Sequence, residues 1–160
     1  MEDFAPDCAA CAALCCLALA FDKGEMFGHD KAAGTPCHHL SGHLCTIHAD
    51  LGEKGYRGCA SFDCLGAGQR VSALFDGSWR DEPARIPAMI SAFRAMRDIQ
   101  ELRQMLVAAR GLTLPPETVA DLDRWQADLA AARKTRAALA AFDPRPLRRW
   151  LRDLARHVPR

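Results

Sequence analysis

The stretch DCAACAALCCLALAFD, residues 7–22, combines four cysteines with a run of alanine and leucine. Alanine and leucine favour helices, so the composition predicts a helix over residues 7–20. In such a helix Cys8, Cys11 and Cys15 would follow one face, with Cys16 about 100° further around the axis than Cys15. We therefore expect one short helix to present several thiols in nearly the same direction.

The other cysteines follow at wider intervals, so that all eight lie within residues 8–64. Soft sulfur ligands select zinc, cuprous copper and iron–sulfur centres over hard cations, and a structural zinc site needs four ligands. Cys45 and His48 are three residues apart, so they would share a face if a helix ran from Cys45 to Leu51. The alternative is that His48 caps or packs. The predicted metal ligands are Cys8, Cys11, Cys15, Cys16, Cys37, Cys45, Cys59, Cys64 and His48.

The apolar run from Ala9 to Phe21 has the length of a signal-peptide core, but its flanks do not fit one. Acidic residues precede it and no Lys or Arg appears before Lys23, whereas a secretory leader begins with positive charge. The run is also too short to span a bilayer. We expect a cytoplasmic protein, in which clustered cysteines ligate metal more often than they form disulfides. A disulfide framework is the competing interpretation, and the adjacent Cys15 and Cys16 suit it poorly.

The second half of the chain has the apolar period of helices. Apolar residues recur at steps of three or four from Ile86 to Leu106, which predicts a helix from about residue 81 to 110 that ends at Gly111. Its methionines, Met89, Met96 and Met105, have the spacing of core residues rather than copper ligands. A second helix is predicted from residue 116 to about 142, and a third from 143 to 157.

These patterns predict a mainly α protein. Residues 1–80 would form a small cysteine-rich metal-binding lobe made of a helix and irregular loops. Residues 81–160 would form an antiparallel helical hairpin with a third short helix, because short links between helices favour antiparallel neighbours.

Charge is distributed unevenly although the net charge is only +1. Residues 1–80 hold 6 Lys/Arg and 10 Asp/Glu, and residues 81–160 hold 15 and 10. The last predicted helix carries a basic face that consists of Arg145, Arg148, Arg149, Arg152 and Arg156. Such a face binds phosphates, anionic lipid or an acidic protein, or it is simply a solvated face. No nucleic-acid motif accompanies it, so nucleic acid is not the expected partner.

The cysteine order resembles that of the YkgJ-like CxxCxxCC cysteine-cluster family, described as zinc- or iron-chelating proteins. The resemblance rests on Cys8-x2-Cys11-x3-Cys15-Cys16, Cys37-x2-Leu40, Cys45-Thr-Ile-His48 and Cys59-x2-Phe62. It implies metal binding over roughly residues 8–64 and a bacterial source, and it implies no particular reaction. The segments around residues 21–37 and 58–71 also look like the cysteine-containing N-terminal part of some bacterial pentapeptide-repeat proteins, although no pentapeptide repeats are present.

Three classes of function remain at this level. The first is a metal-binding protein that holds zinc or an iron–sulfur cluster through thiolates, with a structural or metal-handling role. The second is an interaction module in which a structural zinc ion stabilises the lobe and the C-terminal helices bind a protein partner. The third is a metal- or thiol-dependent enzyme. It is disfavoured because no strand–helix–strand unit precedes Cys8 and Cys11. The candidate general base, Asp63, is a lone acid next to a thiol, which is more typical of a solvated charge.

Overall fold

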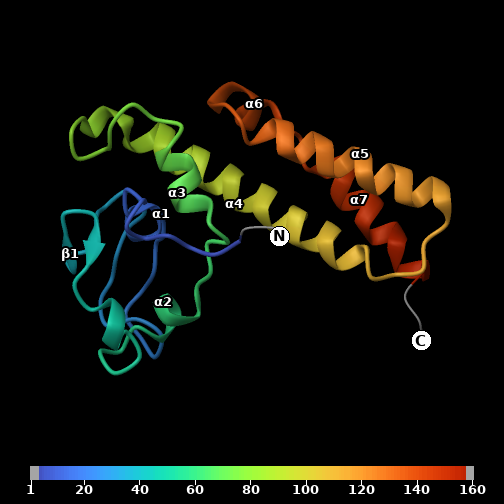
Figure 1. Cartoon of the computed structure of the whole chain (residues 1–160). Helices are drawn as coiled ribbons and strands as arrows, with labels where there is room; N and C mark the ends of the chain where they lie inside the picture. The colour runs from blue at the N-terminus through green and yellow to red at the C-terminus, as the bar shows by residue number, and fades with distance from the viewer. Residues whose placement is uncertain (1–3, 158–160) are drawn as a thin grey trace. The chain divides into compact units, whose positions relative to one another are not determined.

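A computed structural model describes residues 4–157 of the chain and confirms a mainly helical fold (Figure 1). The chain forms two compact units, the first extending to Arg94 and the second beginning at Ala95. The division falls inside a continuous helix, α4 (Ile86–Ala109), whereas the sequence pattern placed a boundary at residues 80 and 81.

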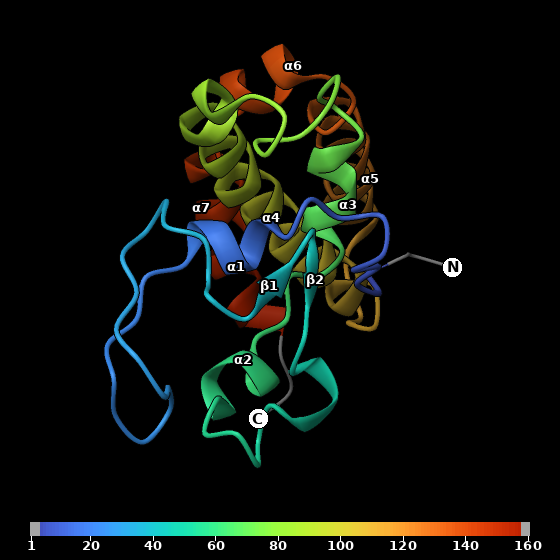
Figure 2. The same ribbon diagram turned by 90° about the vertical axis from the view of Figure 1, so that its left-hand side faces the viewer.

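Short elements make up the first unit. Its helices are α1 (Leu14–Ala18), α2 (Arg57–Ser61) and α3 (Ala67–Ser72), and its 3₁₀ turns are η1 (His48–Asp50) and η2 (Pro83–Arg85). Two strands of two residues each, β1 (Leu40–Ser41) and β2 (Leu44–Cys45), pair antiparallel and lie side by side in Figure 2. Isolated helices of five or six residues are unstable in water, so tertiary packing must hold these elements in place.

The expectation of one helix over residues 7–20 is wrong, because α1 begins only at Leu14. Ala13 has the left-handed conformation, with φ 56°, which a regular helix does not permit. The Asp7 carboxylate accepts hydrogen bonds from the backbone N–H groups of Ala9 and Ala10 and so stabilises a turn there instead. Cys8 and Cys11 therefore lie in turns and do not share a helix face with Cys15.

The helix α1 is anchored by complete burial of its leucines. Leu14 and Leu17 are fully buried, and Trp79 is almost fully buried. The Trp79 indole donates a hydrogen bond of 2.6 Å to the carbonyl of Ala12, just before α1. Val71, which lies in α3, and Trp79 both belong to the core of this unit.

The expected helix from Cys45 to Leu51 is also wrong. Cys45 ends β2, and only the 3₁₀ turn η1 follows it at His48. Gly42, at φ 59°, makes the tight reversal between the two strands, a conformation that glycine adopts readily. Cys45 and His48 consequently lie on different elements and are not neighbours on one helix.

The second unit contains the rest of α4, α5 (Pro116–Ala132), α6 (Arg136–Ala141), α7 (Arg145–Asp153) and η3 (Leu154–His157). The helix predicted over residues 116–142 is interrupted, because the Thr135 hydroxyl accepts a hydrogen bond from the Ala138 N–H and caps a separate α6. Helix α5 runs back antiparallel to α4 (Figure 1), and Arg110 at the end of α4 pairs with Asp123 of α5.

Arginine side chains also link α7 to this unit. Arg148 pairs with Asp98 of α4, and Arg145 pairs with the exposed Asp143 carboxylate beside it. Two members of the predicted basic face therefore have acidic partners within the chain. The side chain of Arg156 lies outside the described residues. Across residues 4–157, no helix combines the length and apolar character that crossing a membrane requires.

Burial along α4 follows the predicted stripe with one exception. Leu102 and Leu106 are fully buried, but Met105 is 41% exposed, so its assignment to the core is wrong. Met89 and Met96 are fully buried, as their spacing predicts.

We predict that Leu102→Ala will lower the free energy of unfolding by about 2–5 kcal/mol, because it leaves a cavity in a close-packed core. Met105→Ala in the same helix should change it by less than about 0.5 kcal/mol. Denaturant unfolding of the two variants, followed by circular dichroism, measures the difference. Equal effects would show that the two side chains have the same surroundings.

Candidate functional site

All eight cysteines are free thiols in the first unit, and they come from separate segments. Cys15 and Cys16 lie in α1, Cys45 in β2 and Cys59 in α2, while the other four lie outside the helices and strands. Cys8 is exposed and the other seven are partly buried.

The closest pair of thiols is formed by consecutive residues of α1. The Sγ atoms of Cys15 and Cys16 are 4.0 Å apart. Two sulfurs bound tetrahedrally to one zinc ion, each at 2.3 Å, lie about 3.8 Å from one another. A shared proton affects the two thiols oppositely: the hydrogen bond from Cys16 lowers the pKa of Cys15 to about 7, and the same bond raises the pKa of Cys16.

Other thiols are within electrostatic range of this pair. Burial is the largest cause that raises the pKa values of Cys8, Cys11, Cys45 and Cys59, and the charge of Cys15 raises each of them further. The charge of Cys37 acts on Cys16, and that of Cys64 acts on Cys8. The thiols of these separate segments therefore act on one another electrostatically, and we call them the thiol neighbourhood.

This neighbourhood is not a preformed coordination sphere. Within residues 4–157, no three His, Cys, Asp or Glu side chains are placed so that they could hold one metal ion. The Cys15–Cys16 pair supplies two sulfurs at a suitable separation. Binding of one metal ion by more of these thiols would require the segments that carry them to move closer together.

A buried lysine lies beside the thiols. Lys31 is only 6% exposed, and its ammonium group donates to the carbonyls of Leu17, Leu19 and Ala32 at 3.2, 2.5 and 3.2 Å. Burial lowers the pKa of Lys31, while the charges of Cys37, Cys16, Cys15 and Cys59 oppose that effect. The positive charge of Lys31 thus favours ionised thiols nearby.

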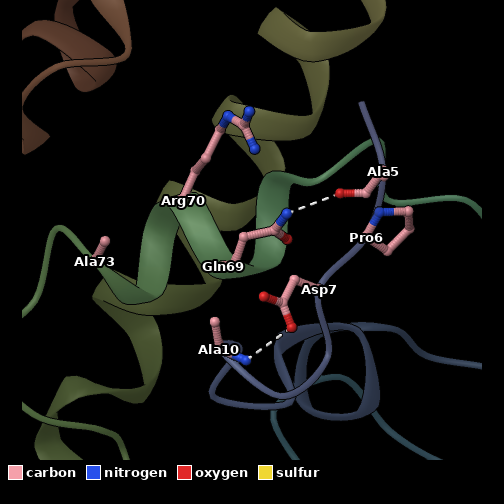
Figure 3. A pocket seen from close by; sticks show the side chains of 7 residues that line it. All are labelled: Ala5, Pro6, Asp7, Ala10, Gln69, Arg70 and Ala73. Atoms are coloured by element: carbon pink, nitrogen blue, oxygen red, sulfur yellow. Dashed lines mark hydrogen bonds between the residues drawn. The ribbon is translucent and has the colours of Figure 1, made fainter. Parts of the chain in front are cut away.

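The turn that carries Cys8 and Cys11 rests on α3. Figure 3 shows the shallow hollow between them, where the Gln69 amide donates to the Ala5 carbonyl at 2.9 Å. Cys11 packs directly on α3, since a Cβ added to Gly68 would lie 2.5 Å from the Cys11 sulfur. A side chain at position 68 is therefore incompatible with the observed position of the Cys11 thiol.

Two other residues that were considered from the sequence, His48 and Asp63, are less closely involved with the thiols. His48 is exposed on η1, and nothing places it against the thiols. Asp63 accepts a hydrogen bond of 2.7 Å from the backbone N–H of Leu65, which has the left-handed conformation with φ 52°. The Asp63 carboxylate thus stabilises the turn that follows it, and this accounts for its presence near Cys64.

Three histidines and a tyrosine meet next to the thiols, and the sequence pattern did not single them out as a group. We call His29, His38, His39 and Tyr56 the imidazole cluster. The Tyr56 hydroxyl lies 2.9 Å from Nδ1 of His29 and 2.9 Å from Nε2 of His39. Burial and the other imidazoles lower the pKa values of His29 and His39, which favours their neutral form. The density of histidine over residues 37–48 could have indicated part of the imidazole cluster from the sequence alone. His29 and Tyr56 join the cluster only through the fold.

Comparison with known proteins gives one informative match. The chain is 44% identical over 103 residues to the uncharacterized protein YybG of Bacillus subtilis (strain 168), which covers 62% of this chain and 37% of that protein. The chain thus spans little more than a third of the length of this relative. No family model and no solved structure matches the chain.

We predict that Lys31→Met will destabilise the first unit by about 1–3 kcal/mol, because three carbonyls lose a buried donor. Lys23→Met, at an exposed position in the same loop, should have little effect. Hydrogen exchange at the amides of residues 14–18 measures local stability in both variants. Unchanged protection in Lys31→Met would contradict a structural role for the ammonium group.

We also predict that Gly68→Ala will displace the Cys11 thiol and destabilise the first unit by about 1–3 kcal/mol. Gly52→Ala is the control, because nothing lies within 4 Å of a Cβ added there. Chemical denaturation, with alkylation of Cys11 followed by mass spectrometry, tests both effects. Wild-type stability together with wild-type alkylation would show that α3 does not constrain Cys11.

Proposed function

We propose that this protein binds a thiophilic metal, as zinc or as an iron–sulfur centre, through cysteines gathered around Cys15 and Cys16. The proposal rests mainly on one observation: thiols from separate segments lie within electrostatic range of a cysteine pair whose sulfurs are 4.0 Å apart. Thiolates are the ligands that these metals prefer. The resemblance of the cysteine order to the YkgJ-like family supports the same function.

The charge balance of the site is consistent with this proposal. Four thiolates around a divalent ion carry a net charge of about −2, which is costly to hold in a partly buried place. The ammonium group of Lys31 interacts electrostatically with Cys15, Cys16, Cys37 and Cys59 and offsets part of this charge. A lysine in this position would repel a bare cation but stabilises an anionic metal–thiolate centre.

Metal binding would be coupled to folding of the first unit. The helices and strands between residues 14 and 72 are at most six residues long, so secondary structure alone contributes little to their stability. Ligation would draw the segments that carry Cys37, Cys45, Cys59 and Cys64 towards α1. The free energy of binding then becomes part of the free energy of folding. This gives the metal a structural role, whether or not the protein also transfers it.

We predict that purified wild-type protein contains bound metal, and that its removal by a strong chelator opens residues 8–64 while α4–α7 remain helical. Trypsin cleavage at the buried Lys31 reports opening of the first unit, and circular dichroism reports the retained helix. Brown protein with broad visible absorption would indicate an iron–sulfur centre, and colourless protein with stoichiometric zinc would indicate a zinc site.

The variant Cys15→Ser/Cys16→Ser should lose most of this metal, as measured by mass spectrometry of the elements. Ser41→Ala, at an exposed position on β1, serves as the control and should keep it. The proposal fails if the protein contains no metal when it is prepared anaerobically, or if protection of Lys31 is the same with and without chelator.

A further inference from the structure

We infer that the imidazole cluster is a second metal site, which binds one divalent transition ion of the zinc, nickel or copper class through imidazole nitrogen and the oxygen of Tyr56, whose proton is released to solvent on binding. This inference goes beyond the proposed function, because it concerns donors other than sulfur. It rests on the positions of His29, His38, His39 and Tyr56 in the first unit.

The adjacent residues His38 and His39 bring two ring nitrogens together. Their Nε2 atoms are 3.0 Å apart, while their ring centres are only 4.1 Å apart and the rings are inclined by 56°. In a linear N–H···N hydrogen bond between two imidazoles the ring centres would be separated by about 5 Å or more. The observed contact is bent, so the two nitrogens lie close together without pointing straight at each other. Two nitrogens bound to one zinc ion at 2.0–2.1 Å lie about 3.3 Å apart.

Two further donor groups, the Tyr56 hydroxyl and the His29 imidazole, lie close to these nitrogens. The Tyr56 oxygen is 2.9 Å from Nε2 of His39, and Nδ1 of His29 is 2.9 Å from that oxygen. The ring centres of His29 and His38 are 4.0 Å apart. The phenol can donate its one proton to one imidazole neighbour and accept from the N–H of the other, so these hydrogen bonds gather ring nitrogens and an oxygen in one place.

The cluster is both held in place and accessible. Tyr56 is 5% exposed, and a Cβ added to Gly28 would lie 3.0 Å from its hydroxyl, so the backbone beside His29 packs on the phenol. His38 is exposed and gives an ion a path from solvent. The three imidazoles do not yet surround one point, in keeping with the lack of a three-ligand arrangement in residues 4–157. His38, His39 and Tyr56 would bind first, and a small movement of the residue 28–30 loop would add His29.

Zinc loading of the full chain under anaerobic conditions tests the inference. After removal of excess ion, wild-type protein should hold one more zinc ion per chain than His38→Gln/His39→Gln, and zinc X-ray absorption should lose nitrogen and oxygen neighbours in the variant but keep sulfur. His157→Gln, in the second unit, is the matched control and should retain the wild-type amount. Equal zinc content in wild type and the double variant overturns the inference.

Loading the protein with cobalt distinguishes metal bound at the imidazole cluster from metal bound at the thiol site. Sulfur-to-cobalt charge transfer reports thiolate ligation only, so it should persist in His38→Gln/His39→Gln and disappear in Cys15→Ser/Cys16→Ser.

Tyr56→Phe keeps the ring packing and removes the oxygen, and it should weaken binding of the second ion about tenfold or more. Unaltered affinity in Tyr56→Phe contradicts the phenol as a ligand, and loss of the charge-transfer band in the histidine variant contradicts separate sites.

Discussion

The buried ammonium group of Lys31 is the contact on which the thiol-bearing unit depends. A charge that is 6% exposed needs partners, and it finds them in three carbonyls, two of which belong to the end of α1. Backbone pairing of Phe21 with Lys31 closes the intervening chain into a loop at the same place. The Lys31 side chain thus donates hydrogen bonds to the C-terminal end of α1, holds the loop that carries His29, and brings positive charge near the thiols.

The sequence was most informative where a single period extends over many residues. The apolar repeat of α4 correctly predicted a long helix that ends before Gly111, since burial of one stripe determines such a helix. Elements of five or six residues have no period to detect. Composition therefore suggested a helix through Ala13, where the backbone turns left-handed, and missed the capped break at Thr135. At both places local hydrogen bonding overrides helix propensity.

The donors near the candidate sites differ in how far the sequence alone reveals them. Thiols are rare enough that eight within residues 8–64 indicate metal chemistry without a structure. Histidine and tyrosine have many ordinary structural roles, so their meaning depends on their neighbours. Tyr56, the single tyrosine of the chain, acquires significance because folding puts its hydroxyl 2.9 Å from histidines that are 17 and 27 residues away.

The two donor sets have complementary charge. Thiolates around a divalent ion form a centre with net negative charge, whereas neutral imidazoles and a single Tyr56 phenolate compensate the charge of their ion only in part. His38 follows Cys37 directly, and the thiols of Cys37, Cys59 and Cys45 act on the pKa of Tyr56 after burial, which is the larger cause of its rise. An anionic centre at the thiols would therefore favour a cation at the imidazole cluster. Occupation of one site would then strengthen binding at the other, because the attraction between the two centres acts in both directions.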